Sequence, residues 1–234
     1  VFKACRDEIK PGISTHDVDK LCYDIIRSYD AIPSFLIYGQ PPFPGTICAS
    51  VNDEVVHGIP RKTRILQEGD IISVDVGAIL DGYQSDACRT YMVGNVAPEV
   101  KDLVERTEMS FWIGLEYAKV GMRTGDIGHA IQEYCEGFGY GVVRELTGHG
   151  IGTTMHQDPD VPNYGRPGHG YKLKKGMAIC IEPMITLGTR EIEQLDDRWT
   201  IVTQDGKPAS RYENTILITD EGPYLTTYDY EEGY

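Results

Sequence analysis

Four acidic residues interrupt apolar segments that otherwise have the pattern of buried strands. Asp75 lies in IISVDVG, Glu182 in CIEPMI and Glu213 in RYENTILI. Asp86 lies on the strand that returns after the turn signal Asp81-Gly82. A buried carboxylate without a partner costs several kcal/mol, so four of them brought together require cations. Because paired divalent ions held by carboxylates are a recurring device of hydrolases, the sequence predicts a two-metal hydrolytic centre.

Glycines flank one histidine that could complete such a centre. His149 lies between Gly148 and Gly150 in TGHGIG, and glycines let the backbone approach a ligand closely. We therefore expect His149 to be a neutral fifth ligand. His57 and His156 also lie in loop segments, but a lone loop histidine is more often structural than catalytic. The residues alone leave the roles of these two open.

Basic side chains are the alternative source of positive charge. Arg89, Arg144 and Arg211 are the only basic residues near these strands. We expect them to be too few for four acids and too long for the pocket. Any single acid could be an exposed or salt-bridged carboxylate, but the joint placement of four acids in apolar strands favours metal ligation.

Two segments of the chain repeat, and they indicate how the acids are positioned. The helix start Gly12–Val18 (GISTHDV) matches Gly121–Ile127 (GMRTGDI), each with a threonine that could cap the helix. The strand Leu66–Asp75 matches Leu173–Glu182, and each copy ends in an acid. The offsets of 109 and 107 residues predict a single catalytic domain of two related halves, about 1–97 and 98–234. The first helix of the first half is expected to be truncated relative to its counterpart.

The remaining elements follow from local pattern. The Asp-Gly signal predicts a hairpin of strands 71–79 and 83–93, and a β-branched strand is predicted at 211–219. Helices are predicted over about 100–120 and 124–137. The fold class is therefore α+β, with antiparallel strands flanked by helices.

Composition limits the possible partners. The 234 residues are 41% hydrophobic and have a formal net charge of −14, and no apolar run approaches the roughly 18 residues of a membrane span. The negative charge disfavours nucleic acid and anionic lipid as primary ligands. Six scattered cysteines and the lack of a secretory pattern favour a reducing, cytoplasmic location.

The chain resembles type I methionine aminopeptidases in five ordered segments, SVNDEVVHGIP, IISVDVGAILDGYQSDACRTYMVG, TGHGIGTTMHQDP, MAICIEPMI and RYENTILITD. The resemblance runs through nearly the whole chain from about Lys10. It implies the duplicated pita-bread fold, a metalloexopeptidase activity, and removal of the N-terminal methionine from nascent proteins and peptides whose second residue is small.

The resemblance also implies which residues act. The matching positions bind two divalent ions through the four acids and one histidine, namely Asp75, Asp86, His149, Glu182 and Glu213. Oxygen-rich ligation with one imidazole suits Co²⁺, Mn²⁺, Fe²⁺ or Zn²⁺. Glu182 is expected to act as general base for a metal-bridged hydroxide. His156 would stabilise the developing oxyanion, and His57 would contact the peptide nitrogen or the leaving side.

A pocket for the methionine side chain is implied as well. It would be formed by soft and aromatic residues, namely Tyr38, Phe43, Cys48, Met155 and Trp199. Two positions depart from the family pattern. Val56 stands where cysteine often precedes the substrate-contacting histidine, and Asn214 stands where histidine often follows the last ligand. We expect both to lie beside the site and not in it.

The expected partners are the N-termini of nascent polypeptides, bound by a monomeric enzyme. A basic loop with Lys172, Lys174 and Lys175 could make a transient contact with ribosomal RNA, although a solvated turn is the simpler explanation. Neither a membrane nor a nucleic-acid substrate is expected.

Three other functions compete with this one. Proline-specific peptidases of the same fold share the ligand set but usually carry a large additional N-terminal domain, for which we expect no room. Type II methionine aminopeptidases carry a helical insert, which the segment between His156 and Glu182 is too short to hold. A binding module that has lost catalysis would lack metal ligands, whereas all five are present here.

Overall fold

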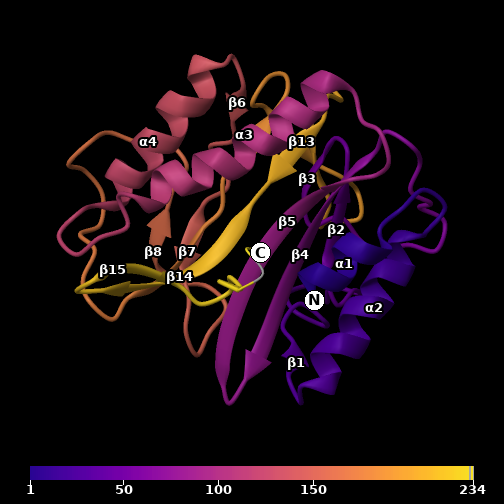
Figure 1. Ribbon diagram of the computed structural model, residues 1–234, viewed down its shortest axis with the longest axis horizontal. Coiled ribbons are helices and arrows are strands. Elements are labelled where there is room, and N and C mark those ends of the chain that lie inside the picture. The colour runs from indigo at the N-terminus through magenta and orange to yellow at the C-terminus, as the bar shows by residue number, and fades with distance from the viewer. Residues whose placement is uncertain (232, 234) are drawn as a thin grey trace.

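A long antiparallel hairpin, β4 (Ile71–Leu80) and β5 (Tyr83–Met92), crosses the centre of the molecule (Figure 1). Asp81 and Gly82 connect the two strands, and both have positive φ, as a two-residue Asp-Gly turn requires. The predicted hairpin is confirmed.

The computed structural model describes residues 1–231 and 233. Its helices are α1 (Phe2–Glu8), α2 (Thr15–Ser28), α3 (Pro98–Leu115) and α4 (Thr124–Gly137). Its other strands are β1 (Ile32–Pro33), β2 (Cys48–Val51), β3 (Glu54–Val56), β6 (Gly141–Val142), β7 (Gly148–Gly150), β8 (Gln157–Val161), β9 (Ala178–Ile181), β10 (Met184–Thr186), β11 (Ile192–Gln194), β12 (Ile201–Thr203), β13 (Ala209–Arg211), β14 (Glu213–Thr219) and β15 (Gly222–Leu225).

One nine-stranded sheet carries both parts of the chain. Its strands follow the order β1-β4-β5-β14-β9-β7-β8, with β2 also paired to β4 and β15 to β14. The pairs of this sheet are antiparallel. Two three-stranded sheets, β13-β10-β6 and β11-β12-β3, complete the strand pairing of the described residues.

The helices cover the nine-stranded sheet in two groups (Figure 1). Val18 of α2 packs in one core cluster with Ile72 and Val74 of β4. Phe111 of α3 packs in a second cluster with Ile216 of β14. Helices packed on an antiparallel sheet confirm the predicted α+β class. The helix predicted to reach residue 120 ends earlier, because the chain after α3 closes into turns.

Equivalent hydrogen bonds recur in the two halves. The Gly12 N–H donates to the Leu66 carbonyl, and the Gly121 N–H donates to the Leu173 carbonyl. The helices that follow, α2 and α4, each have 14 residues. These matches support the predicted duplication, and we propose that the halves divide near residue 97.

The predicted threonine caps are wrong, because Thr15 and Thr124 are the first residues inside their helices. Ser14 is the cap of α2, and its hydroxyl accepts from the Asp17 N–H. Each threonine hydroxyl instead accepts a backbone N–H from a segment distant in sequence, from Arg61 in the first half and Tyr171 in the second. The threonines therefore link the first turn of each helix to a loop segment that lies beside it.

The strand predicted at 211–219 is divided in the structure. β13 ends at Arg211 and pairs with β10, whereas β14 begins at Glu213 and pairs with β5 and β9. The break falls at Tyr212, whose N–H donates to the Pro183 carbonyl. It brings Arg211 and Glu213 together at the centre of the molecule from two different sheets.

Two glycines of α4 test the packing of this helix. A Cβ at Gly128 would lie 2.4 Å from the carbonyl oxygens of Pro162 and Tyr164, whereas a Cβ at Gly137 would meet nothing within 4 Å. Overpacking costs about 1–3 kcal/mol, and alanine favours a helix over glycine by about 1 kcal/mol. We predict that Gly128→Ala lowers the free energy of unfolding by about 2 kcal/mol and that Gly137→Ala does not lower it. Urea unfolding measures both, and equal effects would contradict the packing described.

Candidate metal centre

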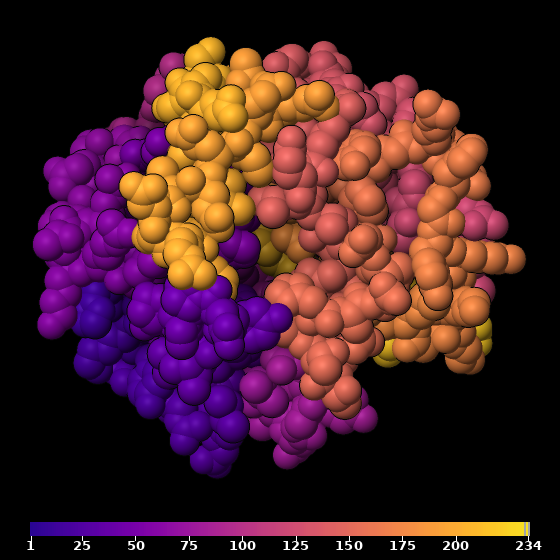
Figure 2. Space-filling model, turned by 180° about the vertical axis from the view of Figure 1, so that it is seen from behind, coloured from indigo at the N-terminus to yellow at the C-terminus, as the bar shows by residue number. Residues whose placement is uncertain are grey.

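A cavity of about 490 Å³ is lined by residues between 35 and 86 and by residues between 145 and 211. Figure 2 shows it as a hollow at the centre of the face, bordered by indigo-to-purple N-terminal residues and by salmon-to-orange residues from later in the chain. Most of the site residues expected from the sequence line it, namely Tyr38, Phe43, Cys48, His57, Asp75, Asp86, His149, His156, Glu182 and Trp199. Glu213 is fully buried beneath this surface.

The four acids converge from four strand positions. Asp75 lies on β4, Asp86 on β5 and Glu213 at the start of β14, while Glu182 directly follows β9. The register explains the convergence, because Cys88 lies opposite both Asp75 and Glu213. All four side chains are buried.

Burial makes the charged forms of these acids costly. It raises the pKa of Asp86 and of Glu213 well above their usual values, and the neighbouring carboxylates raise them further. Burial also raises the pKa of Glu182 to about 7, although Arg211 opposes this shift. A cation placed among the carboxylates would restore their ionised forms.

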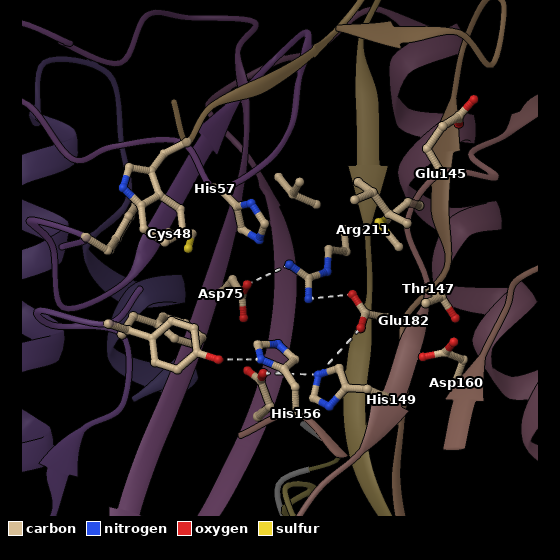
Figure 3. Close-up of a pocket in the computed structure, with 18 of the residues that line it drawn as sticks. Cys48, His57, Asp75, Glu145, Thr147, His149, His156, Asp160, Glu182 and Arg211 are labelled. Carbon is tan, nitrogen blue, oxygen red and sulfur yellow. Dashed lines mark hydrogen bonds and ion pairs between the residues drawn. The ribbon is translucent and has the colours of Figure 1, made fainter. Parts of the chain in front are cut away.

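Arg211 lies among the acids, contrary to the expectation that it is too long for the pocket. One terminal nitrogen, Nη1, lies 2.6 Å from Asp75 Oδ2, and the other, Nη2, lies 2.7 Å from Glu182 Oε2 and 2.5 Å from Glu213 Oε2. Figure 3 shows the guanidinium between Asp75 and Glu182. The expectation is wrong because the side chain enters from the end of β13, directly beside the acids.

The other two arginines do not neutralise the cluster. Arg89 donates to the carbonyls of Cys88 and Glu213 and to the Asn214 side chain. Arg144 pairs with Glu136. One guanidinium therefore faces four carboxylates, and the prediction that the arginines are too few holds.

Unpartnered oxygen atoms show that the residues fit a metal ion. Asp75 Oδ1, Asp86 Oδ1 and Glu213 Oε1 are buried without a hydrogen-bond partner among the described residues. Buried polar atoms are nearly always satisfied, so three orphaned carboxylate oxygens in one cluster indicate a ligand that accepts their lone pairs. Carboxylate oxygens with one imidazole suit divalent transition metals.

His149 is oriented toward the same place. Its Nδ1 lies 2.9 Å from the Gly150 carbonyl, so the proton on Nδ1 donates to that oxygen and Nε2 is left as a potential metal ligand. Burial lowers the pKa of His149 and keeps the ring neutral. Nε2 lies 3.8 Å from Asp86 Oδ2 and 3.7 Å from Glu182 Oε1.

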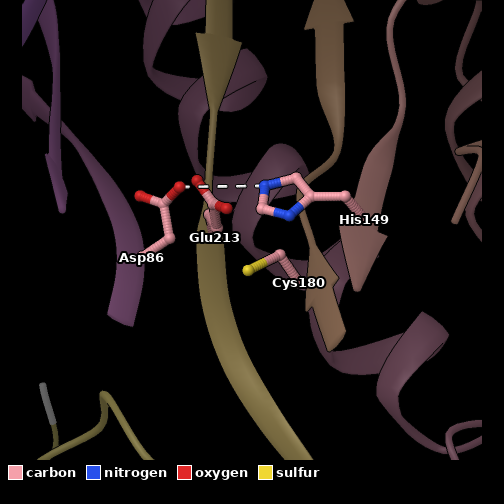
Figure 4. Close-up of side chains that lie close together, drawn as sticks. All are labelled: Asp86, His149, Cys180 and Glu213. Atoms are coloured by element: carbon pink, nitrogen blue, oxygen red, sulfur yellow. Dashed lines mark ion pairs between the residues drawn. The ribbon is translucent and has the colours of Figure 1, made fainter. Parts of the chain in front are cut away.

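Cys180 is a neighbour that the sequence reasoning missed. Potential ligand atoms of Asp86, His149, Cys180 and Glu213 all lie within 4.8 Å of one another (Figure 4). Burial raises the pKa of the Cys180 thiol well above its usual value, and the nearby carboxylates act in the same direction. The sequence contains a signal for this neighbour, because Cys180 and Glu182 are two residues apart and side chains at this spacing face the same side of an extended chain.

The two loop histidines line the same cavity. The Tyr38 hydroxyl lies 2.8 Å from His156 Nδ1, and the His156 ring meets that of His149 edge-on with centroids 4.4 Å apart. His57 has a φ of 57° and faces Trp199 edge-on. Burial lowers the pKa of both His57 and His156 to about 4, so both rings are neutral.

An apolar wall lies beside the histidines. Phe43 and Trp199 meet edge-to-face with centroids 5.2 Å apart. Phe35 also lines the cavity, and the sequence reasoning missed it. Met155, in contrast, is not among the lining residues, because it packs in the core behind the wall with Phe35 and Phe43.

The two departures from the family pattern differ in position. Val56 lines the cavity, so the expectation that it lies beside the site is wrong. Its strand, β3, forms part of the cavity wall. Asn214 is fully buried and is not among the lining residues, and its side-chain oxygen accepts from Arg89 and Thr227.

Comparison with known proteins places this geometry in a family. Residues 1–220 match the model of metallopeptidase family M24. The chain is 56% identical over 218 residues to a methionine aminopeptidase of Clostridium acetobutylicum, covering 93% of this chain and 86% of that protein. The crystal structure of the Thermotoga maritima methionine aminopeptidase matches with a TM-score of 0.94 and 41% identity, covering 97% of this chain and 90% of that chain.

A prolidase from Pyrococcus furiosus shares the fold at 24% identity. Its TM-score is 0.77, and the match covers 97% of this chain and 59% of that chain. These structures confirm the pita-bread fold expected from the sequence.

Glu213→Gln tests whether the acid cluster holds metal. Glu213 Oε1 has no other partner, so we predict that this variant loses at least one equivalent of Mn²⁺, measured by elemental analysis after dialysis. Glu54→Gln is the matched control, because Glu54 accepts the Val51 N–H and does not line the cavity, so its replacement should leave the bound metal unchanged. Full metal content in Glu213→Gln would show that Glu213 is not a metal ligand.

Proposed function

The chain belongs to metallopeptidase family M24, and we propose that it removes the N-terminal methionine from polypeptides by hydrolysis at this centre. One observation carries the proposal: buried carboxylate oxygens without partners surround a neutral histidine in a cavity. Relatives named methionine aminopeptidases, one of them 56% identical to this chain, support the choice of substrate. The enzyme is accordingly a hydrolase and an aminopeptidase.

The metal would be held by the expected set, namely Asp75, Asp86, His149, Glu182 and Glu213. We propose two divalent ions, with Co²⁺, Mn²⁺, Fe²⁺ and Zn²⁺ all compatible with these donors. When bound, such ions activate water and polarise the scissile carbonyl. The protein supplies the geometry that aligns the substrate with them.

Glu182 is the proposed general base. Its carboxylate lines the cavity and lies 3.7 Å from His149 Nε2, so it can take a proton from the attacking water and later return it to the leaving amine. The Asn163 side chain donates to the Glu182 carbonyl and fixes the backbone at this position.

The tautomer of His156 suits an oxyanion donor. If the Tyr38 hydroxyl donates to Nδ1, the proton lies on Nε2 and can be donated to the substrate. We propose that Nε2–H stabilises the negative charge on the carbonyl oxygen in the transition state. His57, on the neighbouring wall, would hydrogen-bond the peptide nitrogen or the leaving side.

The apolar wall accounts for recognition of methionine. Tyr38, Phe43, Cys48 and Trp199 line the cavity and present aromatic and sulfur surfaces that suit a thioether, with Met155 packed behind them. The carboxylates of the centre and of Asp160 attract the α-amine of a peptide. The apolar wall thus complements the thioether side chain of an N-terminal methionine, and the carboxylates complement its α-amine.

The proposed substrates in the cell are nascent polypeptides, met by a monomeric enzyme in the cytoplasm. The six cysteines are free thiols, which agrees with a reducing location. No helix among the described residues is long and apolar enough to cross a membrane. A transient ribosome contact through Lys172, Lys174 and Lys175 belongs to the same proposal.

His156→Ala is predicted to lower kcat by about 10² to 10³ with unchanged metal content, because an oxyanion donor acts mainly in the transition state. Tyr38→Phe should cause a smaller loss, since the imidazole remains in place. Steady-state kinetics and elemental analysis distinguish the roles. Loss of metal from His156→Ala would instead make His156 a ligand.

A peptide panel tests the substrate. The Mn²⁺-loaded enzyme should cleave Met-Ala and Met-Gly peptides, cleave Met-Lys poorly and leave Ala-Pro almost untouched, and a chelator should abolish all cleavage. Norleucine in place of methionine should retain weak turnover, because small changes in an apolar pocket discriminate by only about 10 to 200-fold. Preferred cleavage of Ala-Pro would overturn the methionine assignment while leaving the metal centre intact.

A further inference from the structure

Arg211 is a charged residue of the acid cluster that the proposed mechanism does not use. Its side chain is nearly fully buried, at 6% exposure, and contacts three of the four acids. Its Nε has no partner among the described residues. The two terminal nitrogens, aimed at the carboxylates, therefore hold the guanidinium in place.

Arg211 divides the centre into two unequal sides. On one side it contacts Asp75, whose other oxygen is unpartnered. On the other side, the potential ligand atoms of Asp86, His149 and Glu213 lie close together, and Asp75 is not part of that group. The His149 side keeps unpartnered oxygens on Asp86 and Glu213 that can take a cation, whereas on the Asp75 side the guanidinium already supplies a positive charge.

Electrostatic repulsion favours the same division. The guanidinium carries one positive charge and lies within 2.7 Å of oxygen atoms of Asp75, Glu182 and Glu213. A second divalent ion bound to Asp75 would lie close to this positive charge, and like charges repel strongly in a buried site. The second ion should therefore compete with the guanidinium.

We propose that Arg211 is a resident cation that holds the Asp75 side of the centre and must withdraw before a second divalent ion binds there. The cavity that Arg211 lines offers space for this withdrawal. Arg211 is a positioning residue, because it keeps Asp75 and Glu182 in place when metal is scarce. The proposal rests on the proposed function in taking this cluster as the metal centre.

A Mn²⁺ titration of the metal-free full-length chain by calorimetry tests the proposal. The variants are Arg211→Gln, which removes the charge, and Arg211→Lys, which keeps the charge but loses the forked geometry. Arg89→Gln is the matched control, because Arg89 is a buried arginine that contacts backbone carbonyls and Asn214 but no carboxylate.

In Arg211→Gln the second equivalent of Mn²⁺ should bind at least about tenfold more tightly than in the unmodified protein, with the first equivalent changed by less than about threefold. Metal-free Arg211→Gln should melt at a lower temperature than the unmodified protein, and saturating Mn²⁺ should narrow the difference. Arg89→Gln should lower the melting temperature with and without metal and leave the ratio of the two affinities unchanged.

Equal second-ion affinities in Arg211→Gln and the unmodified protein would overturn the proposal, as would loss of both ions. If Arg211→Gln does not fold, Arg211→Lys decides the question. Tighter binding of the second Mn²⁺ than in the unmodified protein supports the proposal, and unchanged or weaker binding overturns it. Hydrolysis of Met-Ala separates this outcome from the proposed function. Hydrolysis with unchanged affinities refutes only the role of Arg211, and shifted affinities without hydrolysis refute only the peptidase assignment.

Discussion

The burial of four carboxylates around one point is the constraint on which this structure depends. Each acid comes from a different strand position, so the register of the β4-β5 hairpin and of β14 must be correct for them to meet. Like charges in a buried place repel and resist ionisation. The fold tolerates them because Arg211 neutralises part of the charge and because the remaining oxygens are arranged as metal ligands.

The three histidines around the acids are uncharged, and this follows from the same constraint. Burial lowers the pKa of His57, His149 and His156, so none of the three adds a positive charge that would compete with a metal ion. Neutral imidazoles can ligate or donate hydrogen bonds, which are the two functions that hydrolysis at such a centre requires. The neutral histidines thus leave the buried carboxylates free to bind metal cations.

Much of this arrangement could be predicted from the sequence because it depends on local pattern. An acid inside an apolar strand and the Asp81-Gly82 turn are visible in single segments, and the structure confirms the hairpin. Contacts between distant segments could not be predicted in this way. The entry of Arg211 depends on the chain break at Tyr212, and the place of Met155 behind the wall depends on packing against Phe35. Local pattern carries no information on either feature.

Anomalous X-ray diffraction from crystals equilibrated with Mn²⁺ can determine whether the acid cluster is a metal centre. We expect an anomalous peak at about 2.0–2.3 Å from His149 Nε2 and from the carboxylate oxygens of Asp86, Glu182 and Glu213. At higher Mn²⁺ a second peak should arise near Asp75 with the Arg211 guanidinium moved away. The absence of any peak within the cluster, with all four acids still buried around Arg211, would show that the cluster does not bind metal.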